Sequence, residues 1–325
     1  MLASVATKIS ETAELRARRL LAQGIARNLG DPVAAAQWML AVQAQNYNAG
    51  KAQLALRSAD PSGDIAAGRI VRTWSQRGTH HFLAAEDAEW MMQLCHPRIE
   101  RAAEKRRAGL QLSAVQFETA KHTLLDALRD GPVSRPEAYE LFAAAGVDPE
   151  GGRGPHILRS VGSCGGVVQA PRNGNIERFM LVEHLTQDSA DFEGDAALAE
   201  LARRYILSRG PVTAQDLAWW AGITVSDAKR GVRAALAGRG ATDFVEIELA
   251  GGKYLMGAYQ LEYSDTDFAA ALAAEYRLPA FDEYLMGYKD RSAQLPRELV
   301  AEVGPTKNGL VHPFTVLDGV VTGRR

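Results

Sequence analysis

The chain has 325 residues with 46% apolar side chains, which suffices for two or three globular units. A net charge of −2 argues against a uniformly basic nucleic-acid-binding protein, and no apolar stretch reaches the length of a membrane span. The first 110 residues nevertheless hold 15 Lys and Arg against 10 Asp and Glu, so a local basic face stays open.

The N-terminal part is predicted to be mainly helical. Apolar spacing and caps favour helices over 11–25, from the Asp31-Pro32 start onwards, over 49–56 and over 64–71. Residues 72–84 are typical of a β segment that turns near Gly78, and a long helix over 86–107 is expected to follow.

An internal repeat begins after this helix. The segment 131–134, Gly-Pro-Val-Ser, recurs 79 residues later as Gly-Pro-Val-Thr at 210–213. A helical pattern precedes each copy, and Ser134 or Thr213 stands where a helix N-cap belongs, with Glu137 or Asp216 three residues later. Each copy therefore predicts a helix followed by a short capped helix.

Each copy continues with a third helix and a hairpin. The helices are expected over 155–163 and 226–238, and the hairpins are expected to turn at Asn173-Gly174 and at Gly251-Gly252. Helix, short helix, helix and hairpin is the order of a winged helix-turn-helix, and the N-terminal part fits the same plan. After residue 263 the pattern becomes rich in strands and turns.

The sequence thus predicts a mainly α fold with β-hairpin wings. It is expected to contain three tandem winged helix-turn-helix units over 1–112, 113–190 and 191–260, followed by a β-rich, barrel-like C-terminal domain over 261–325. Asp282 and Arg291 are expected to pair within that last domain, and Trp219 and Trp220 to fill the core of the third unit.

Three segments carry a family resemblance. They are 42–47 (Val-Gln-Ala-Gln-Asn-Tyr), 71–83 (Val-Arg-Thr-Trp-Ser-Gln-Arg-Gly-Thr-His-His-Phe-Leu) and 278–292 (Leu-Pro-Ala-Phe-Asp-Glu-Tyr-Leu-Met-Gly-Tyr-Lys-Asp-Arg-Ser). With them the chain resembles the AlkZ/YcaQ winged-helix DNA glycosylases over essentially its whole length. The resemblance implies hydrolysis of the N-glycosidic bond of alkylated, sometimes crosslinked, purines in duplex DNA. It also implies a Gln-x-Gln catalytic motif, which Gln43 and Gln45 match.

Two glutamines can serve this chemistry because of the leaving group. A purine alkylated at N3 or N7 is cationic and departs neutral without a general acid, so the enzyme mainly has to position a water beside the sugar carbon. An amide offers one acceptor oxygen and two donors for that purpose. The alternative for Gln43 and Gln45 is a polar helix end that caps neighbouring backbone groups.

Candidate DNA-binding residues fall into three groups, and each group also has a structural alternative. Arg77, Thr79 and His81 lie on the predicted wing, where His81 matches the family's histidine and could instead be structural. A basic run on the long helix and a basic third helix could meet phosphates, or simply be solvated helix faces. These last two groups are Arg101, Lys105 and Arg106, and Lys229, Arg230 and Arg233.

The sequence also indicates which cofactors and partners to expect. Cys95 and Cys164 lack a CxxC partner and no cofactor motif occurs, so we expect free thiols, no metal and no cofactor. We expect a monomer that binds double-stranded DNA in the cytoplasm, associated with the nucleoid. The alternatives are a non-enzymatic winged-helix regulator, which would normally dimerise on DNA, and a protein-interaction adaptor, which would not bind duplex at all.

Overall fold

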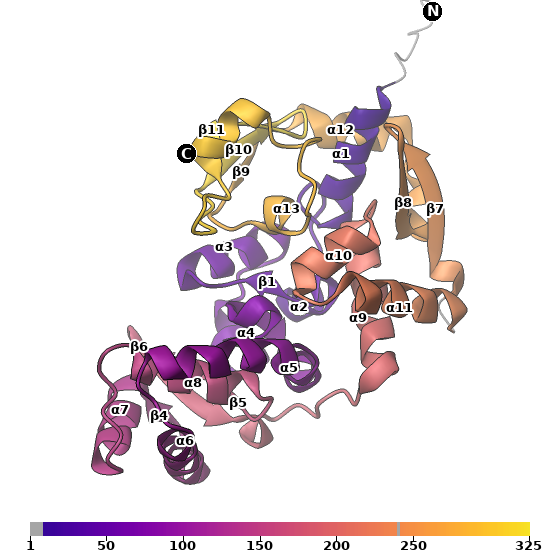
Figure 1. Cartoon of the computed structure of the whole chain (residues 1–325). Coiled ribbons are helices and arrows are strands. Elements are labelled where there is room, and N and C mark those ends of the chain that lie inside the picture. The colour runs from indigo at the N-terminus through magenta and orange to yellow at the C-terminus, as the bar shows by residue number, and fades with distance from the viewer. Residues whose placement is uncertain (1–8, 239–240) are drawn as a thin grey trace, which may run out of the picture.

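The computed structural model describes residues 9–238 and 241–325. Helices and short strands alternate in its N-terminal part (Figure 1). The elements are α1 (Glu11–Ala22), α2 (Pro32–Met39), β1 (Val42–Gln43), α3 (Tyr47–Arg57), α4 (Ser62–Ala66), β2 (Ile70–Trp74), the 3₁₀ turn η1 (Gln76–Gly78), β3 (His80–Ala84) and α5 (Ala85–Gly109). Most predicted helices are confirmed within a few residues, as is the β segment that turns near Gly78.

The helix expected over 64–71 is wrong. Helix α4 ends at Ala66, Gly68 turns the chain with φ of +71°, and strand β2 begins at Ile70. β-Branched side chains at Ile70, Val71 and Thr73 fit a pleated strand better than a helix, and all five residues of β2 are buried.

The internal repeat is also a repeat of elements. The first copy contains α6 (Ala114–Arg129), β4 (Val133–Ser134), α7 (Arg135–Ala144), α8 (Arg153–Ser163), β5 (Val167–Asn173) and β6 (Ile176–Leu181). The second contains α9 (Gly194–Arg209), α10 (Ala214–Ala221), α11 (Val225–Ala237), β7 (Phe244–Leu249) and β8 (Gly252–Gly257). Both copies thus run helix, short helix, helix and hairpin, as predicted.

Caps and strand pairing are equivalent in the two copies. Ser134 and Thr213 each begin a capping box, as predicted. Val133 pairs with the second strand of its hairpin in β4–β6, and Val212 forms a β-bridge to Leu255 in β8. Each hairpin turn lies one residue away from the predicted dipeptide, at 174–175 and at 250–251.

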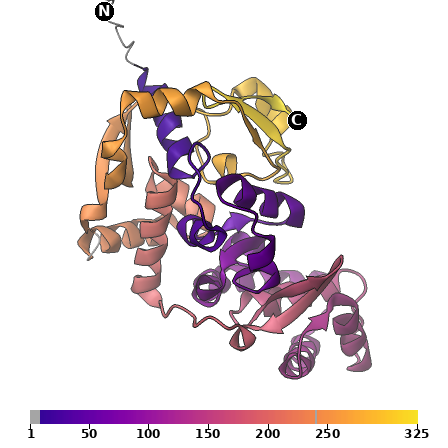
Figure 2. The same ribbon diagram turned by 180° about the vertical axis from the view of Figure 1, so that it is seen from behind.

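One antiparallel sheet joins the N-terminal part to the first repeat copy. Its strand order is β1-β3-β2-β5-β6-β4, and the two hairpins meet where Arg72 of β2 pairs with Gln169 of β5. Each hairpin edge is thereby covered by its neighbour, which removes two unpaired strand edges. The third hairpin, β7–β8, stays separate, and an extended segment crosses from the first copy to α9 (Figure 2).

The C-terminal part contains α12 (Asp265–Ala273), β9 (Tyr276–Leu278), α13 (Glu283–Met286), α14 (Val300–Val303), β10 (Phe314–Leu317) and β11 (Val320–Arg324). The expectation of a barrel-like domain is wrong for the described residues, because β11-β10-β9 form an open three-stranded sheet. Between β9 and β10 the chain forms turns and short helices around Pro296 and Pro305, and proline cannot donate to a strand ladder.

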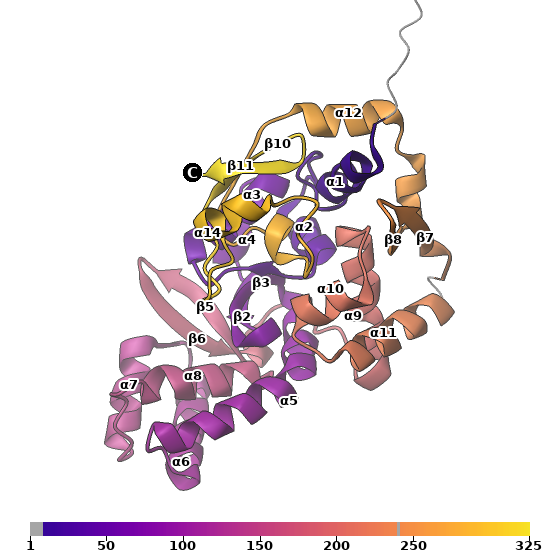
Figure 3. The ribbon, with the colours of Figure 1, turned by 45° about the horizontal axis from the view of Figure 1, so that its top comes forward.

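The N-terminal helix belongs to the same core as this sheet. Leu20 of α1 packs in one buried cluster with Tyr284 and Phe314, and α12 lies across α1 (Figure 3). Helix α1 and the C-terminal part are therefore held together by apolar burial. No helix in the described part of the chain is long and apolar enough to cross a membrane.

Candidate active site and basic cleft

Gln43 and Gln45 lie on an extended segment at the edge of the six-stranded sheet. Gln43 ends β1 and stands opposite His81 of β3, while Val42 and Ala44 point into an apolar cluster with Phe82. Alternation along the segment therefore directs Gln43 away from that cluster. The two glutamines differ in access, because Gln43 is buried and Gln45 is exposed.

A closed ring of three hydrogen bonds holds the backbone of Gln43. Its N–H donates to Oε1 of Glu283 (3.2 Å), the N–H of Glu283 donates to Oε1 of Gln53 (3.2 Å), and Nε2 of Gln53 donates to the carbonyl of Gln43 (2.9 Å). All three residues are buried. The ring joins β1, α3 and α13, so the C-terminal part fixes the strand that carries Gln43.

Glu283 is itself anchored on a second side. Its Oε2 accepts from both Nη2 of Arg209 and Nε1 of Trp220, each at 2.8 Å, and the Arg209 and Glu283 side chains are completely buried. Removing one partner of such a pair would leave a buried charge, which is costly. The sequence prediction missed Gln53, Arg209 and Glu283; the only signal for Glu283 was its place in the 278–292 segment.

Two buried acceptor atoms near this ring have no partner among the described residues. They are Oε1 of Gln43 and Nε2 of His81, whose residues face each other across β1 and β3. Nδ1 of His81 lies 3.0 Å from the carbonyl of Thr79, which can only accept, so the proton resides on Nδ1. Facing side chains with unused acceptors can bind a water, which has two protons to donate.

His80 belongs to a charged network that also contacts the segment with Gln45. Oε1 of Gln45 accepts from the backbone N–H of His80 (3.3 Å), and Arg72 donates to the carbonyls of Ala44 and Gln45. Arg72 also pairs with Glu177 (2.9 Å) of β6. This network couples the glutamine segment to the first repeat copy, and the sequence prediction did not include it.

The buried histidines predict a pH-dependent stability. Burial, together with neighbouring arginines, lowers the pKa of His80 and of His81 well below the ordinary value. Burial also lowers the pKa of His96 and His156. Below about pH 6.5 the unfolded chain therefore binds protons that the folded chain does not, so the free energy of unfolding should fall as pH falls.

The expected slope approaches about 1.4 kcal/mol per pH unit for each histidine that stays neutral. Urea unfolding between about pH 7 and about pH 5.5 measures it, because ordinary carboxylates titrate below that window. His80→Gln should make the slope shallower by the contribution of one histidine, which is at most about 1.4 kcal/mol per pH unit. Equal or higher stability at the lower pH would contradict the assignment.

The three candidates on the predicted wing lie inward. The Arg77 side chain is partly buried and its Nη1 donates to the carbonyl of Trp220, the Thr79 hydroxyl donates to the carbonyl of Gln76 (3.2 Å), and His81 is completely buried. A contact between His81 and the DNA backbone does not fit this position. If His81 contacts DNA, the contact must be to a nucleotide that has left the duplex and entered the protein.

The two groups of basic residues that were predicted on helices lie mostly at the surface. Arg101, Lys105 and Arg106 are exposed on α5. Lys229 and Arg233 are exposed on α11, while Arg230 of that helix is engaged by Asp195 (2.9 Å) and Asp227 (3.2 Å). Arg230 is therefore less available to a phosphate than its two neighbours.

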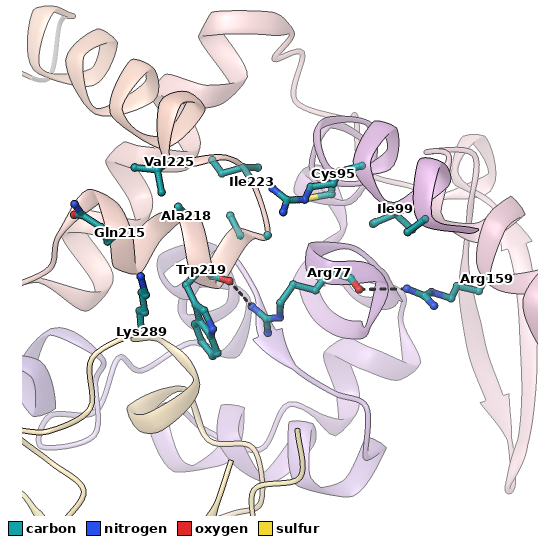
Figure 4. A pocket seen from close by; sticks show the side chains of 14 residues that line it. Arg77, Cys95, Ile99, Arg159, Gln215, Ala218, Trp219, Ile223, Val225 and Lys289 are labelled. Atoms are coloured by element: carbon teal, nitrogen blue, oxygen red, sulfur yellow. Dashed lines mark hydrogen bonds between the residues drawn. The ribbon is translucent and has the colours of Figure 1, made fainter. Parts of the chain in front are cut away.

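An open cleft of about 470 Å³ lies where α5, the 76–78 turn, α10 and α11 meet. We call it the basic cleft, because Arg77, Arg98, Arg159 and Lys289 line it and no lining residue is acidic. In Figure 4, Arg77 lies between Trp219 and Arg159. Trp219 is only partly buried and contacts the guanidinium groups of Arg77 and Arg291, whereas Trp220 fills the core as predicted.

Comparison with known proteins gives concordant results. A family model described as "DNA glycosylase AlkZ-like" matches residues 36–325. A protein of Streptomyces sahachiroi named "Interstrand DNA cross-link repair glycosylase" is 27% identical over 305 residues, which cover 87% of this chain and 78% of the relative. The solved structure of DNA glycosylase AlkZ from the same organism matches with a TM-score of 0.75 and 21% identity, over 97% of this chain and 87% of that one.

Proposed function

Because the chain belongs to the AlkZ-like DNA glycosylase family, we propose that it hydrolyses the N-glycosidic bond of alkylated purines in duplex DNA. The relative's name adds interstrand DNA crosslinks as a substrate class to test. The family assignment sets aside the regulator and the adaptor as descriptions of this protein. The substrate and the catalytic residues are our proposal.

The observation that carries the proposal is the buried amide oxygen of Gln43, which has no hydrogen-bond partner among the residues that the structure describes and lies on a backbone held by two hydrogen bonds. Burying an acceptor without a partner costs free energy, and such groups in folded proteins call for a functional explanation. A water that donates to Oε1 of Gln43 and to Nε2 of His81 would satisfy both atoms. Its own lone pairs would then remain available to an electron-poor sugar carbon.

The chemistry needs no strong acid. The alkylated base leaves as a neutral purine, and a positioned water adds to the oxocarbenium-like carbon. As the new C–O bond forms, the water must lose a proton, and neutral His81 has a free nitrogen lone pair that can accept it. Because Gln45 is exposed, we assign it to orienting the sugar or the extruded nucleotide.

We further propose the finer architecture. The two repeat copies have the element order of winged helices, and the N-terminal part carries a comparable hairpin, β2–β3. We place the boundaries near 112, 190 and 260, with α1 packed on the C-terminal part. We also propose that the protein acts on DNA as a monomer in the cytoplasm, associated with the nucleoid.

The direct test is base release. Purified protein is incubated with duplex DNA that carries N7-alkylguanine, and abasic sites are counted by alkaline strand cleavage. A second duplex with an interstrand crosslink shows whether the substrate includes crosslinked purines. Release of the alkylated base supports the proposal. If no base is released from either duplex while the protein stays folded, the proposed substrate class is wrong.

Gln45 provides a separate prediction. Gln45→Ala should lower base release by about tenfold, less than a deeply buried positioning group would, because the exposed amide competes with solvent. Gln45→Asp should retain most activity, since a carboxylate still accepts from the N–H of His80 and favours positive charge on the sugar. Single-turnover rates at saturating DNA measure both variants. An Asp variant as slow as the Ala variant would contradict this role.

A further inference from the structure

We propose that the basic cleft is a phosphate site, in which Arg159 contacts one backbone phosphate of the DNA and Arg77, Arg98 and Lys289 add positive charge around it. The proposal rests on the proposed function for its ligand, since DNA supplies the phosphate. It assigns to the cleft a binding step that is distinct from the glutamine chemistry at β1.

The charge of the cleft is not balanced by its lining. Its four cationic side chains come from the 76–78 turn, α5, α8 and the segment after α13, and no carboxylate lines the cleft. The nearby carboxylate of Asp216 already accepts hydrogen bonds from backbone N–H groups. Its Oδ1 accepts from the backbone N–H of Lys289 (2.9 Å), and its Oδ2 accepts from the Thr213 backbone (3.0 Å). An anion from outside would therefore find donors that no carboxylate in the lining of the cleft engages.

Two buried guanidinium atoms have no partner in the described part of the chain. They are Nη2 of Arg77 and Nε of Arg159. Other atoms of the same groups fix both side chains, because Nη1 of Arg77 donates to the carbonyl of Trp220 and Nη2 of Arg159 donates to the carbonyl of Arg77 (3.3 Å). Anchored guanidinium groups with N–H bonds to spare suit the planar, multidentate recognition of phosphate.

Burial of charged groups supports the same conclusion. Burial lowers the pKa of Arg77, and burial followed by the charge of Arg106 lowers the pKa of Arg159. Burial and then the charge of Arg77 lower the pKa of Arg291, behind Trp219, to about 10. The folded protein thus keeps these guanidinium groups buried at a cost in solvation, to which repulsion between Arg106 and Arg159 and between Arg77 and Arg291 adds. A bound phosphate would offset that cost.

Two glycines allow these arginines to approach the backbone closely. A Cβ at Gly78 would lie 2.3 Å from Nη2 of Arg159, and a Cβ at Gly222 would lie 2.8 Å from Cγ of Arg77. Both glycines also have positive φ, of +66° and +71°. The absence of a side chain therefore leaves room for the Arg159 guanidinium at Gly78 and for the side-chain stem of Arg77 at Gly222.

The experiment measures how affinity for unmodified duplex DNA depends on salt. Each phosphate contact contributes about 0.9 to the slope of log K against log salt. Arg159→Gln should make the slope about 0.9 less steep and weaken binding about tenfold at low salt. Arg153→Gln is the matched control, because Arg153 lies on the same helix, outside the cleft, and is paired with Asp148. It should leave the slope unchanged.

Further outcomes separate this site from the proposed chemistry. The binding assay uses undamaged DNA, so it remains valid even if no alkylated base is ever released. Single-turnover base release by the control variant Arg153→Gln at saturating DNA should equal that of the parent. An unchanged salt slope would overturn the phosphate site. Calorimetric binding of inorganic phosphate at micromolar concentration, lost in Arg159→Gln, would also overturn it in favour of a site for a free anion.

Discussion

Replacing Gln43 by alanine is expected to slow base release by about 10²-fold while the affinity for duplex DNA stays nearly unchanged. Removing one group that positions or stabilises the reacting atoms costs on the order of 10²–10³ in rate, and a cationic leaving group places this site near the lower end. Affinity should survive because the buried amide offers little surface to the DNA backbone. Single-turnover rates and equilibrium binding, measured on the same duplex, separate the two effects.

A control is needed because Gln43 is buried. Gln93→Ala removes a glutamine from the exposed face of α5, where it donates only to Glu89, and should change neither rate nor binding. The double variant Gln43→Ala/Gln45→Ala should be less impaired than the product of the single effects, since both amides serve one reaction centre. Parent-like rates for Gln43→Ala, with the protein folded, would place the chemistry elsewhere.

Elements with local signals could be predicted from the sequence. The capping residues Ser134 and Thr213 begin helices because their hydroxyls accept hydrogen bonds from backbone N–H groups three residues later. Such a contact depends only on residues that are close in sequence. The repeat was visible for the same reason. Strand β1 has only two residues, and nothing near it in sequence predicts that β3 pairs with it. Short strands are defined by their partners.

The candidate site was predicted only in part. Gln43 and Gln45 were identified through the family resemblance, but the side chains that fix Gln43 were not. Glu283 lies 240 residues away from Gln43 in sequence, so no periodicity connects the two. The expected Asp282–Arg291 pair is wrong for a similar reason. Asp282 forms its ion pair with Arg57 of α3 instead. Arg291 packs on Trp219 and donates to the carbonyl of Leu285.

Loss of Arg57 is expected to have the largest effect on stability. The Arg57 and Asp282 side chains are completely buried and joined by two hydrogen bonds of 2.8 and 2.9 Å, and Arg57 also donates to the backbone carbonyls of Gln23 and Gln53. Breaking such a pair from one side costs about 3–5 kcal/mol, because an uncompensated charge stays buried. Arg57→Met should therefore lower the free energy of unfolding by that amount in urea titration.

Two further variants show whether the buried charge is the cause. Combining Arg57→Met with Asp282→Asn removes both charges, while an oxygen remains to accept from the N–H of Tyr284, so part of the stability should return. Arg69→Met breaks a more exposed pair with Asp64 and should cost no more than about 1 kcal/mol. If the double variant is as unstable as Arg57→Met alone, lost packing and lost backbone hydrogen bonds explain the effect.

Because Gln53 and Glu283 lie beside this pair, Arg57→Met should also slow base release at temperatures where the variant remains folded. The reason is that it loosens the ring of hydrogen bonds that holds Gln43.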